Sequence, residues 1–240
     1  LQIDPTPGLL GFVFVHDDGF LSTPANREAI AMAIDRDSLA GTLGVGGWQA
    51  ASRVIPNEAG GDLLAAAGRW DTLPLAARRE QARARVQRWN AGKSAPVNLR
   101  IAMPQGPGAD RLFTQISRDL YEVGIQATRA GEGAAADLRL LDVVAPYVRA
   151  SWYYHQFDCT VLRGLCDAQA GRKFAAALAE PDATARVQLL REAVTGLTEA
   201  NIYIPLGQPV RWSLVGGAAT GIAPNRLGYH PLMPMALLPK

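Results

Sequence analysis

The sequence predicts a layered α/β fold, and two observations point to it. The order of strand-like and helix-like patterns between residues 97 and 144 is typical of helices packed on a sheet. The 240 residues are 48% hydrophobic and 19% charged, a composition with enough apolar side chains for a core. A chain of this length forms one large domain or two small ones.

The first elements expected along the chain are a short strand and a helix. Residues 11–15 form a β-rich run that an Asp-Asp-Gly turn ends. The stretch "NREAIAMAIDRDSLA", residues 26–40, predicts one amphipathic helix. Thr23 or Asn26 can cap this helix, and Pro24 suits its first turn.

The predicted helix over residues 26–40 has two faces. Ile30 and Ile34 belong to the apolar stripe that would pack on a sheet. The charged residues are expected on the opposite side: Arg27, Glu28, Asp35 and Arg36. We expect Arg27, Asp35 and Arg36 to tie the helix to neighbouring loops, and nothing on the helix is expected to touch a ligand.

Helices and strands are then expected to alternate, after a loop-rich stretch over residues 50–72. The expected elements are a helix at 73–90, a strand at 97–104, a helix at 108–124, strands at 125–130 and 136–144, and helices at 167–180 and 182–200. Two short strands are predicted around the Gly-Gln-Pro turn at residues 207–209, and the tail after them is proline-rich and extended.

Motifs for cofactor or metal binding are not found. The glycine-rich turn at Gly106 has Arg111 where a dinucleotide loop needs its third glycine, and no Gly-Lys-Ser/Thr follows, so a tight turn is favoured. The three histidines, His16, His155 and His230, are far apart, so no metal site and no cofactor is predicted. No Gly-x-Ser-x-Gly motif marks a nucleophile, and the chain is not expected to be an enzyme.

Charge and hydropathy exclude two further classes of protein. The net charge of +2, from 24 basic and 22 acidic residues, does not favour a nucleic-acid partner. No apolar run reaches the roughly 18 residues of a membrane span. The first ten residues have no initiator Met, basic region or long apolar run, so they are not a signal peptide, and we expect a mature form or an excised fragment.

The two cysteines, Cys159 and Cys166, fit neither redox nor zinc motifs. They are either free thiols of a cytosolic protein or a disulfide, and the disulfide is favoured because the pair flanks a turn-like segment around Gly164. A loop this short would gain about 2–3 kcal/mol from its cross-link. A disulfide would place the protein outside the reducing cytosol.

The segment "PYVRASWYYHQF", residues 146–157, concentrates aromatic side chains in a chain that is only 7% aromatic: Tyr147, Trp152, Tyr153, Tyr154 and Phe157. Such rings suit a ligand surface or a packed core, and we expect some to face a cleft and others to pack inside. The later phrase "PVRWSL" adds Arg211 and Trp212, and packing is the favoured role for Trp212.

Several phrases, taken in order, resemble the family 5 extracellular solute-binding proteins, the oligopeptide, dipeptide and nickel binders of ABC importers. "NREAIAMAIDRDSLA" is similar to the family's "vRqAlayAIDReal", and the preceding "GFVFVHDDGFLSTP" looks like its strand and loop. Similar phrases continue over residues 73–130, 136–159 and 186–215. The resemblance covers nearly the whole chain.

The resemblance implies one lobe of a periplasmic-binding-protein-like (type II) fold, a mixed sheet flanked by helices. It implies that residues 1–220 are the second lobe and that residues 221–240 return towards a first, N-terminal lobe absent from this chain. Its further implications are a periplasmic or extracellular location, a peptide or small-molecule ligand, and inner-membrane ABC permease subunits as partners. The residues expected to bind the ligand are Tyr147, Arg149, Trp152, Tyr153 and Arg211.

One departure from the family concerns the ligand. Peptide-binding members have an acidic residue for the ligand's α-amino group where this chain has Ala145-Pro146, although a small shift in alignment would bring in Asp142. Arg149 favours an anionic or carbonyl-rich ligand instead. The alternatives are a sensor domain with the same fold, or an α/β enzyme using Asp17, Asp18 or His155 as acid–base groups.

Overall fold

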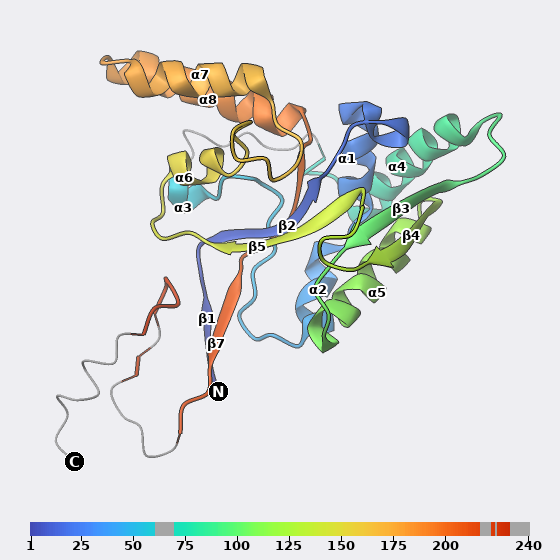
Figure 1. Ribbon diagram of the computed structural model, residues 1–240, viewed down its shortest axis with the longest axis horizontal. Helices are drawn as coiled ribbons and strands as arrows, with labels where there is room; N and C mark the ends of the chain where they lie inside the picture. The colour runs from blue at the N-terminus through green and yellow to red at the C-terminus, as the bar shows by residue number, and fades with distance from the viewer. Residues whose placement is uncertain (61–69, 217–221, 224, 231–240) are drawn as a thin grey trace.

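The computed structural model describes residues 1–60, 70–216, 222–223 and 225–230 (Figure 1). Within these ranges the elements are β1 (Gln2–Pro5), β2 (Gly8–Phe14), the 3-10 helix η1 (Gly19–Ser22), α1 (Pro24–Ala33), α2 (Arg36–Leu43), α3 (Asn57–Gly60), α4 (Leu75–Asn90), β3 (Val97–Ala102), α5 (Pro107–Tyr121), β4 (Ile125–Ala130), β5 (Leu138–Val144), α6 (Ala150–His155), α7 (Ala168–Ala179), α8 (Ala183–Glu199), β6 (Tyr203–Gly207) and β7 (Val210–Ser213).

The main sheet has five strands in the order β4-β3-β5-β2-β6. β3 is parallel to both β4 and β5, whereas β2 is antiparallel to β5 and β6. The sheet is therefore mixed. Because helices cover it, the predicted α/β class with a mixed sheet flanked by helices is confirmed.

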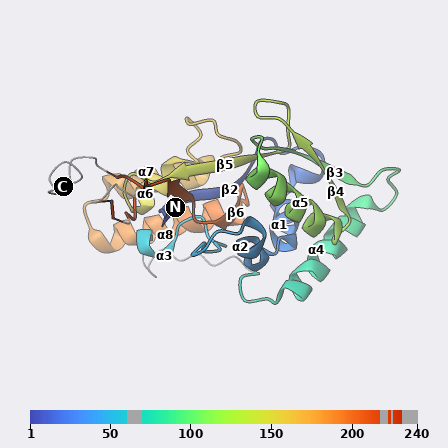
Figure 2. The same ribbon diagram turned by 90° about the horizontal axis from the view of Figure 1, so that it is seen from below.

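Each face of the sheet has its own apolar core, because successive side chains of a strand point to opposite faces. Phe12 and Phe14 of β2 belong to the core that α1, α4 and α5 cover. Leu9 and Val13, on the other face of the same strand, belong to the core built with α6, α7 and α8. Figure 2 shows these two groups of helices towards opposite ends of the molecule.

A second, two-stranded ribbon leaves the main sheet. β1 pairs antiparallel with β7, with Asp4 opposite Arg211 and Ile3 opposite Trp212. In Figure 1 the ribbon runs away from the main sheet, and the N-terminus lies at its far end. The two strands predicted around the turn at 207–209 therefore exist, but β6 joins the main sheet and β7 joins the ribbon.

The prediction of one helix over residues 26–40 is wrong, because the structure has α1 and α2 with a break at Ile34 and Asp35. The Asp35 carboxylate accepts a hydrogen bond from Ser38 N at 3.3 Å and so caps α2. The Asp35 amide donates to the Asp119 carboxylate at 2.9 Å. The Arg36 guanidinium donates to the carbonyls of Ala31 and Ile34, which would otherwise be unpaired at the end of α1.

The prediction that the charged residues form a separate polar face is also wrong, because Arg27, Glu28 and Arg36 are buried. Arg27 donates to the carbonyl oxygens of Leu21, at 2.7 Å, and Ala200, at 2.6 Å. A buried guanidinium is tolerated when its N–H groups are paired in this way. The prediction that these charges tie the helix to neighbouring loops is confirmed for Arg27, whereas Arg36 donates to Pro205 of β6.

The other expected helices and strands are present within a few residues of their predicted bounds. Thr23, one of the two proposed caps, accepts a hydrogen bond from Asn26 N at 3.3 Å at the start of α1. The unassigned aromatic segment contains the short helix α6. None of the described helices is long and apolar enough to cross a membrane.

The predicted boundary at residue 220 falls largely on residues that the structure does not describe, since 217–221, 224 and 231–240 lie outside it. The described part of the tail, residues 225–230, lies against β1, where Asn225 N donates to the Asp4 carboxylate. The division at residue 220 thus stays a prediction.

Cys159 and Cys166 form the disulfide that the sequence predicts, with their Cα atoms 5.2 Å apart. The loop that it closes packs on the end of β2, where Leu165 N donates to the Phe14 carbonyl at 2.7 Å. Gly164 is needed there, because a Cβ atom would lie 2.4 Å from the same oxygen.

Reducing this disulfide is expected to lower the free energy of unfolding by about 2–3 kcal/mol, because the unfolded chain regains the freedom of the open loop. Urea denaturation with and without dithiothreitol measures the difference. A variant with both cysteines changed to alanine is the control and should not respond to the reductant. An unchanged midpoint for the native protein in reductant would contradict a stabilising role.

Candidate functional site

The features of the candidate site lie at one edge of the main sheet, where β2 begins and where β5 and β6 end. At this edge Thr6-Pro7 connects β1 to β2, and Gln208-Pro209 connects β6 to β7. The loop after β5 lies at the same edge, because Ala145 N donates to the Pro7 carbonyl at 2.8 Å. Both strands of the ribbon therefore leave the sheet beside the loop that contains Tyr147 and Arg149.

A cavity of about 220 Å³ opens at this edge. Segment 49–58 forms one side, held to the sheet by a bridge between Ala50 and Gly207 and by the hydrogen bond from Gln208 N to Gln49 O. The sheet and α6 form the other side. The polar and aromatic lining residues are Gln49, Ser52, Arg53, Asn57, Glu58, Tyr153, Tyr203 and Gln208.

Two buried tyrosines line this cavity. Tyr153 is fully buried, and its ring meets Trp152 edge-on with the centroids 4.9 Å apart. Burial raises the pKa of Tyr153 to about 12, and burial also raises the pKa of Tyr203. Both hydroxyls therefore stay protonated at neutral pH. The Tyr153 hydroxyl lies near the Gly8 backbone but has no well-formed hydrogen bond among the described residues, so it can donate to a ligand.

The rim of the cavity is polar and nearly neutral. Gln208 Nε2 donates to Glu58 Oε1 at 3.0 Å, and Arg53 donates to the Asn57 side chain at 3.0 Å. Arg53 also lies 3.7 Å from the carboxylate of Asp71. With these charges already engaged, the rim offers hydrogen bonds rather than a strong field of one sign.

A bidentate ion pair joins the ribbon to the main sheet beside the loop. The Arg211 guanidinium on β7 contacts the Asp142 carboxylate on β5, with Nη1 and Nη2 each 3.0 Å from Oδ1 and Nη1 3.2 Å from Oδ2. Two parallel N–H···O contacts fix the orientation of both groups. Asp142, the nearest acidic residue on the strand that leads into the loop, is thus neutralised by Arg211.

The five predicted ligand-binding residues all lie at or near this edge, but in different settings. Tyr147, half exposed, and Arg149, exposed, lie on the surface of the loop, and Tyr153 lines the cavity. Trp152 is 9% exposed and packs in the core beneath, so it supports Tyr153 rather than presenting its own surface. Arg211 faces Asp142.

The role favoured for Trp212 is wrong, because its side chain is 69% exposed instead of packed. The reason is the placement of β7 in the two-stranded ribbon, which no helix of the described chain covers. Segment 49–58 and Tyr203 also line the cavity, although no motif in the sequence predicted them. Their place in the cavity depends on pairing between Ala50 and Gly207, which are distant in sequence and carry no local signal of it.

A second, larger groove of about 610 Å³ lies against α7 and α8. Its lining contains residues of both charges, among them the ion pair of Lys173 and Glu192 at 2.8 Å. Figure 1 places these helices far from the ribbon. The smaller cavity is the better candidate, because it lies where both connecting strands leave the sheet and contains a buried hydroxyl that can donate to a ligand.

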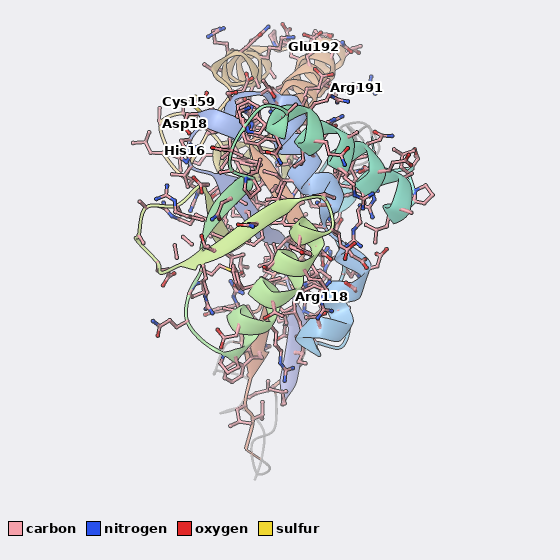
Figure 3. All side chains as sticks on the ribbon, turned by 90° about the vertical axis from the view of Figure 1, so that its right-hand side faces the viewer. His16, Asp18, Arg118, Cys159, Arg191 and Glu192 are labelled. Carbon is pink, nitrogen blue, oxygen red and sulfur yellow. A yellow bond between two sulfur atoms is a disulfide. The ribbon has the colours of Figure 1, made fainter. Side chains whose placement is uncertain are left out.

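The groups considered for acid–base catalysis do not meet in either cavity. His155 is exposed at the end of α6. His16 lies 3.0 Å from Asp18 and 2.8 Å from Asp137, at the opposite end of β2 (Figure 3). Burial raises the pKa of Asp137, but hydrogen bonds from Arg100 N and His16 outweigh it and hold the pKa below its usual value. This cluster ties β3 to the residues around β2 and β5.

Metal ligands are sparse as well: in the part of the chain that the structure describes, no three His, Cys, Asp or Glu side chains gather into a site for an ion.

No family model and no curated protein sequence matches this chain. Its structure is similar to solved structures of binding proteins. The murein tripeptide binding protein MppA of Escherichia coli matches with a TM-score of 0.78 and 16% identity, over 92% of this chain and 46% of its own. OppA of Haemophilus influenzae, in complex with RPPGFSPFR, matches with a TM-score of 0.74 and 15% identity, over 87% and 44%.

The structure is also similar to that of a binding protein solved in complex with a metal chelate. NikA from Brucella suis, in complex with Fe(III)-EDTA, matches with a TM-score of 0.65 and 18% identity, over 87% of this chain and 46% of its own. The chain therefore spans just under half the length of the structures it matches, and at these identities the likeness establishes the fold. The chain has the periplasmic-binding-protein-like fold of a lobe of these solute-binding proteins, as its resemblance to family 5 predicted.

Proposed function

We propose that this chain is one lobe of the substrate-binding component of an ABC importer. It captures a peptide-like or other small solute in a cleft between this lobe and a second one, and the closed protein delivers the solute to permease subunits of the inner membrane. The observation that carries the proposal is the likeness, over about nine tenths of the chain, to solved solute-binding proteins roughly twice as long.

The ribbon of β1 and β7 is the natural connection to the second lobe. Large apolar side chains are exposed on and after it: Trp212, Leu214 and Tyr229 are 69%, 81% and 69% exposed. Such a concentration of exposed apolar surface marks an interaction site. In this proposal residues 1–220 form the lobe, and the second lobe covers this surface.

The charges at the sheet edge favour a ligand rich in carbonyl or carboxylate oxygens. Tyr153 provides a buried O–H donor. Arg149 is exposed and has no side-chain partner among the residues described, so it is available to an anion. Asp142, which would suit a ligand's ammonium group, is already paired with Arg211. A free-amine dipeptide is thus disfavoured.

The disulfide and the fold support a periplasmic or extracellular location, since such cross-links persist in oxidising compartments. Native mass spectrometry of the complete protein, purified without denaturation, tests the function by identifying the solute that it retains. Calorimetric titration with a tripeptide, with RPPGFSPFR and with Fe(III)-EDTA covers the ligand classes of the similar structures. A protein that retains nothing and binds none of the three contradicts the proposal.

Binding by this lobe alone is expected to be much weaker than binding by the complete protein, because half of the cleft contacts are absent. Calorimetric titration of both forms with the retained solute measures the difference. Equal affinities would exclude a cleft between two lobes.

Tyr153→Phe is expected to weaken binding of the retained solute about tenfold, because a buried donor to the ligand is lost without loss of packing. Calorimetric titration of the complete protein measures this effect. Tyr121→Phe is the control, because Tyr121 is 73% exposed at the end of α5. Unchanged affinity in Tyr153→Phe would exclude the cavity from the site.

A further inference from the structure

Residues 225–230 fold back across the ribbon and contact both of its strands. Asn225 N donates to Asp4 Oδ1 at 3.1 Å, and His230 Nε2 lies 2.6 Å from Asp4 Oδ2. Between these two contacts the segment makes a tight turn, in which Gly228 N donates to the Asn225 carbonyl and Gly228 has a φ of +64°. A segment near the end of the chain is thereby attached to its first strand.

Asp4 is the anchor of this arrangement. Only 1% of its side chain is exposed, and Gln2 Nε2 supplies a third donor at 3.2 Å. Burial raises the pKa of Asp4, but the hydrogen bonds from Asn225 and His230 outweigh it and hold the pKa below its usual value. The carboxylate is therefore ionised at neutral pH, and charge-assisted hydrogen bonds of this kind are about twice as strong as neutral ones.

The turn also packs on the stem of Arg211. A Cβ atom at Gly228 would lie 3.2 Å from Arg211 Cγ and 3.0 Å from Thr6 Cγ2, so any larger residue at this position would press the turn against the ribbon. Arg211 stands opposite Asp4 in the register of β1 and β7. The aliphatic part of the Arg211 side chain is thus confined by the turn, while its guanidinium forms the bidentate ion pair with Asp142.

We propose that residues 225–230 are a clasp, anchored by Asp4, which holds Arg211 in the orientation that neutralises Asp142. Asp4 acts through Arg211 and is a positioning residue. When the clasp is closed, the sheet edge offers no free carboxylate on β5 to a cationic ligand. When it opens, Asp142 is released and the edge accepts a ligand with an ammonium group. The consequence for ligands rests on the proposed function, whereas the clasp itself does not.

Hydrogen–deuterium exchange of the complete, ligand-free protein tests the clasp. Gly228→Ala is expected to speed amide exchange in the ribbon and in residues 225–230 about tenfold, the effect of losing a charge-assisted contact. Gly133→Ala is the matched control, because Gly133 also has a positive φ, +81°, but no atom lies within 4 Å of an added Cβ. Equal exchange in the two variants would overturn the proposal.

Two further pairs of variants separate the anchor from a general loss of stability. Asp4→Asn is expected to speed exchange in the same segments, whereas Glu192→Gln, which weakens an ion pair between α7 and α8, leaves them unchanged. His230→Ala should resemble Asp4→Asn, and His230→Gln, which keeps an N–H donor, should restore slow exchange. Failure of that rescue would exclude the contact with Asp4 as the anchor.

Trialanine, which has a free ammonium group, and N-acetyl-trialanine, which has none, are the probes for a released Asp142 carboxylate. Asp4→Asn is expected to raise the affinity for trialanine, relative to that for N-acetyl-trialanine, about tenfold. In a protein that already carries Arg211→Gln, adding Asp4→Asn should not change this ratio further. An unchanged ratio in a variant with fast exchange would show that Asp4 does not act through Arg211. If neither peptide binds to any variant, peptide binding itself is contradicted, and the exchange data still decide the clasp.

Discussion

Gly11→Ala is expected to destabilise the protein by about 4 kcal/mol or more, because a central strand has no room for a methyl group. A Cβ atom at this position would lie 2.2 Å from the Ile204 carbonyl oxygen and 2.5 Å from the Tyr203 hydroxyl. β2 is paired on both sides, and its register with β6 shifts between Leu10 and Gly11. Because the backbone of β6 cannot move without breaking this pairing, the loss extends to the whole sheet.

Gly41→Ala is the matched control for this substitution. Gly41 lies within α2, and no atom is within 4 Å of an added Cβ. Alanine is the better helix former, so this variant should gain up to about 1 kcal/mol. Urea denaturation of both variants gives the comparison. A Gly11→Ala protein that unfolds at the same urea concentration as the native protein would contradict the close approach of β2 and β6.

Arg36→Ala is expected to destabilise the protein by about 3–5 kcal/mol, because it leaves buried carbonyl groups without a donor and opens a cavity. Arg36 Nε donates to Pro205 O at 2.7 Å, and Nη1 donates to Ala31 O at 2.9 Å. The guanidinium also lies 4.7 Å from the centre of the Trp70 ring. One side chain thus joins α1, α2 and β6. Arg172→Ala, at an exposed position on α7, should change stability by less than about 0.5 kcal/mol in the same assay.

The pH dependence of stability gives a second measure of Arg36. Burial lowers its pKa from 12.5 to about 9, so at pH 7 it is charged in both the folded and the unfolded protein. Between these two values the unfolded chain binds more protons, so this group makes stability rise with pH. The slope of unfolding free energy between pH 9 and 10.5 should therefore be more positive for the native protein than for Arg36→Met. Identical slopes would contradict a buried charge.

The sequence predicted those elements whose signal lies within a single segment. α4 begins just after Pro74, α5 ends before Gly124 and α8 follows its capping Asp182, while the strands from residue 97 to 144 follow alternation. The break between α1 and α2 was missed because Asp35 is held by Asp119, which is distant in sequence. Arg27 and Arg36 look like surface residues in a helical pattern, and only carbonyl groups that are distant in sequence make their burial possible.

The candidate site was predictable only in part, for the same reason. A local concentration of aromatic residues pointed to Tyr153, and the loop before it to Arg149. The cavity itself requires segment 49–58 to meet β6, and the pairing of Arg211 with Asp142 requires two strands from different sheets. Neither contact leaves a pattern in neighbouring residues. Tertiary pairing, rather than local propensity, therefore decides the chemistry of this edge.

The pairing of β2 also has a consequence for biosynthesis. β2 leaves the ribosome well before both of its partners, because β5 begins at Leu138 and β6 begins at Tyr203. At a translation rate of about 5–20 residues per second, the second partner emerges roughly 10–40 s after the strand itself. Until β5 emerges both edges of this apolar strand are open to other chains, and until β6 emerges one edge remains open. The nascent chain should therefore depend on a holding chaperone until β6 has been made.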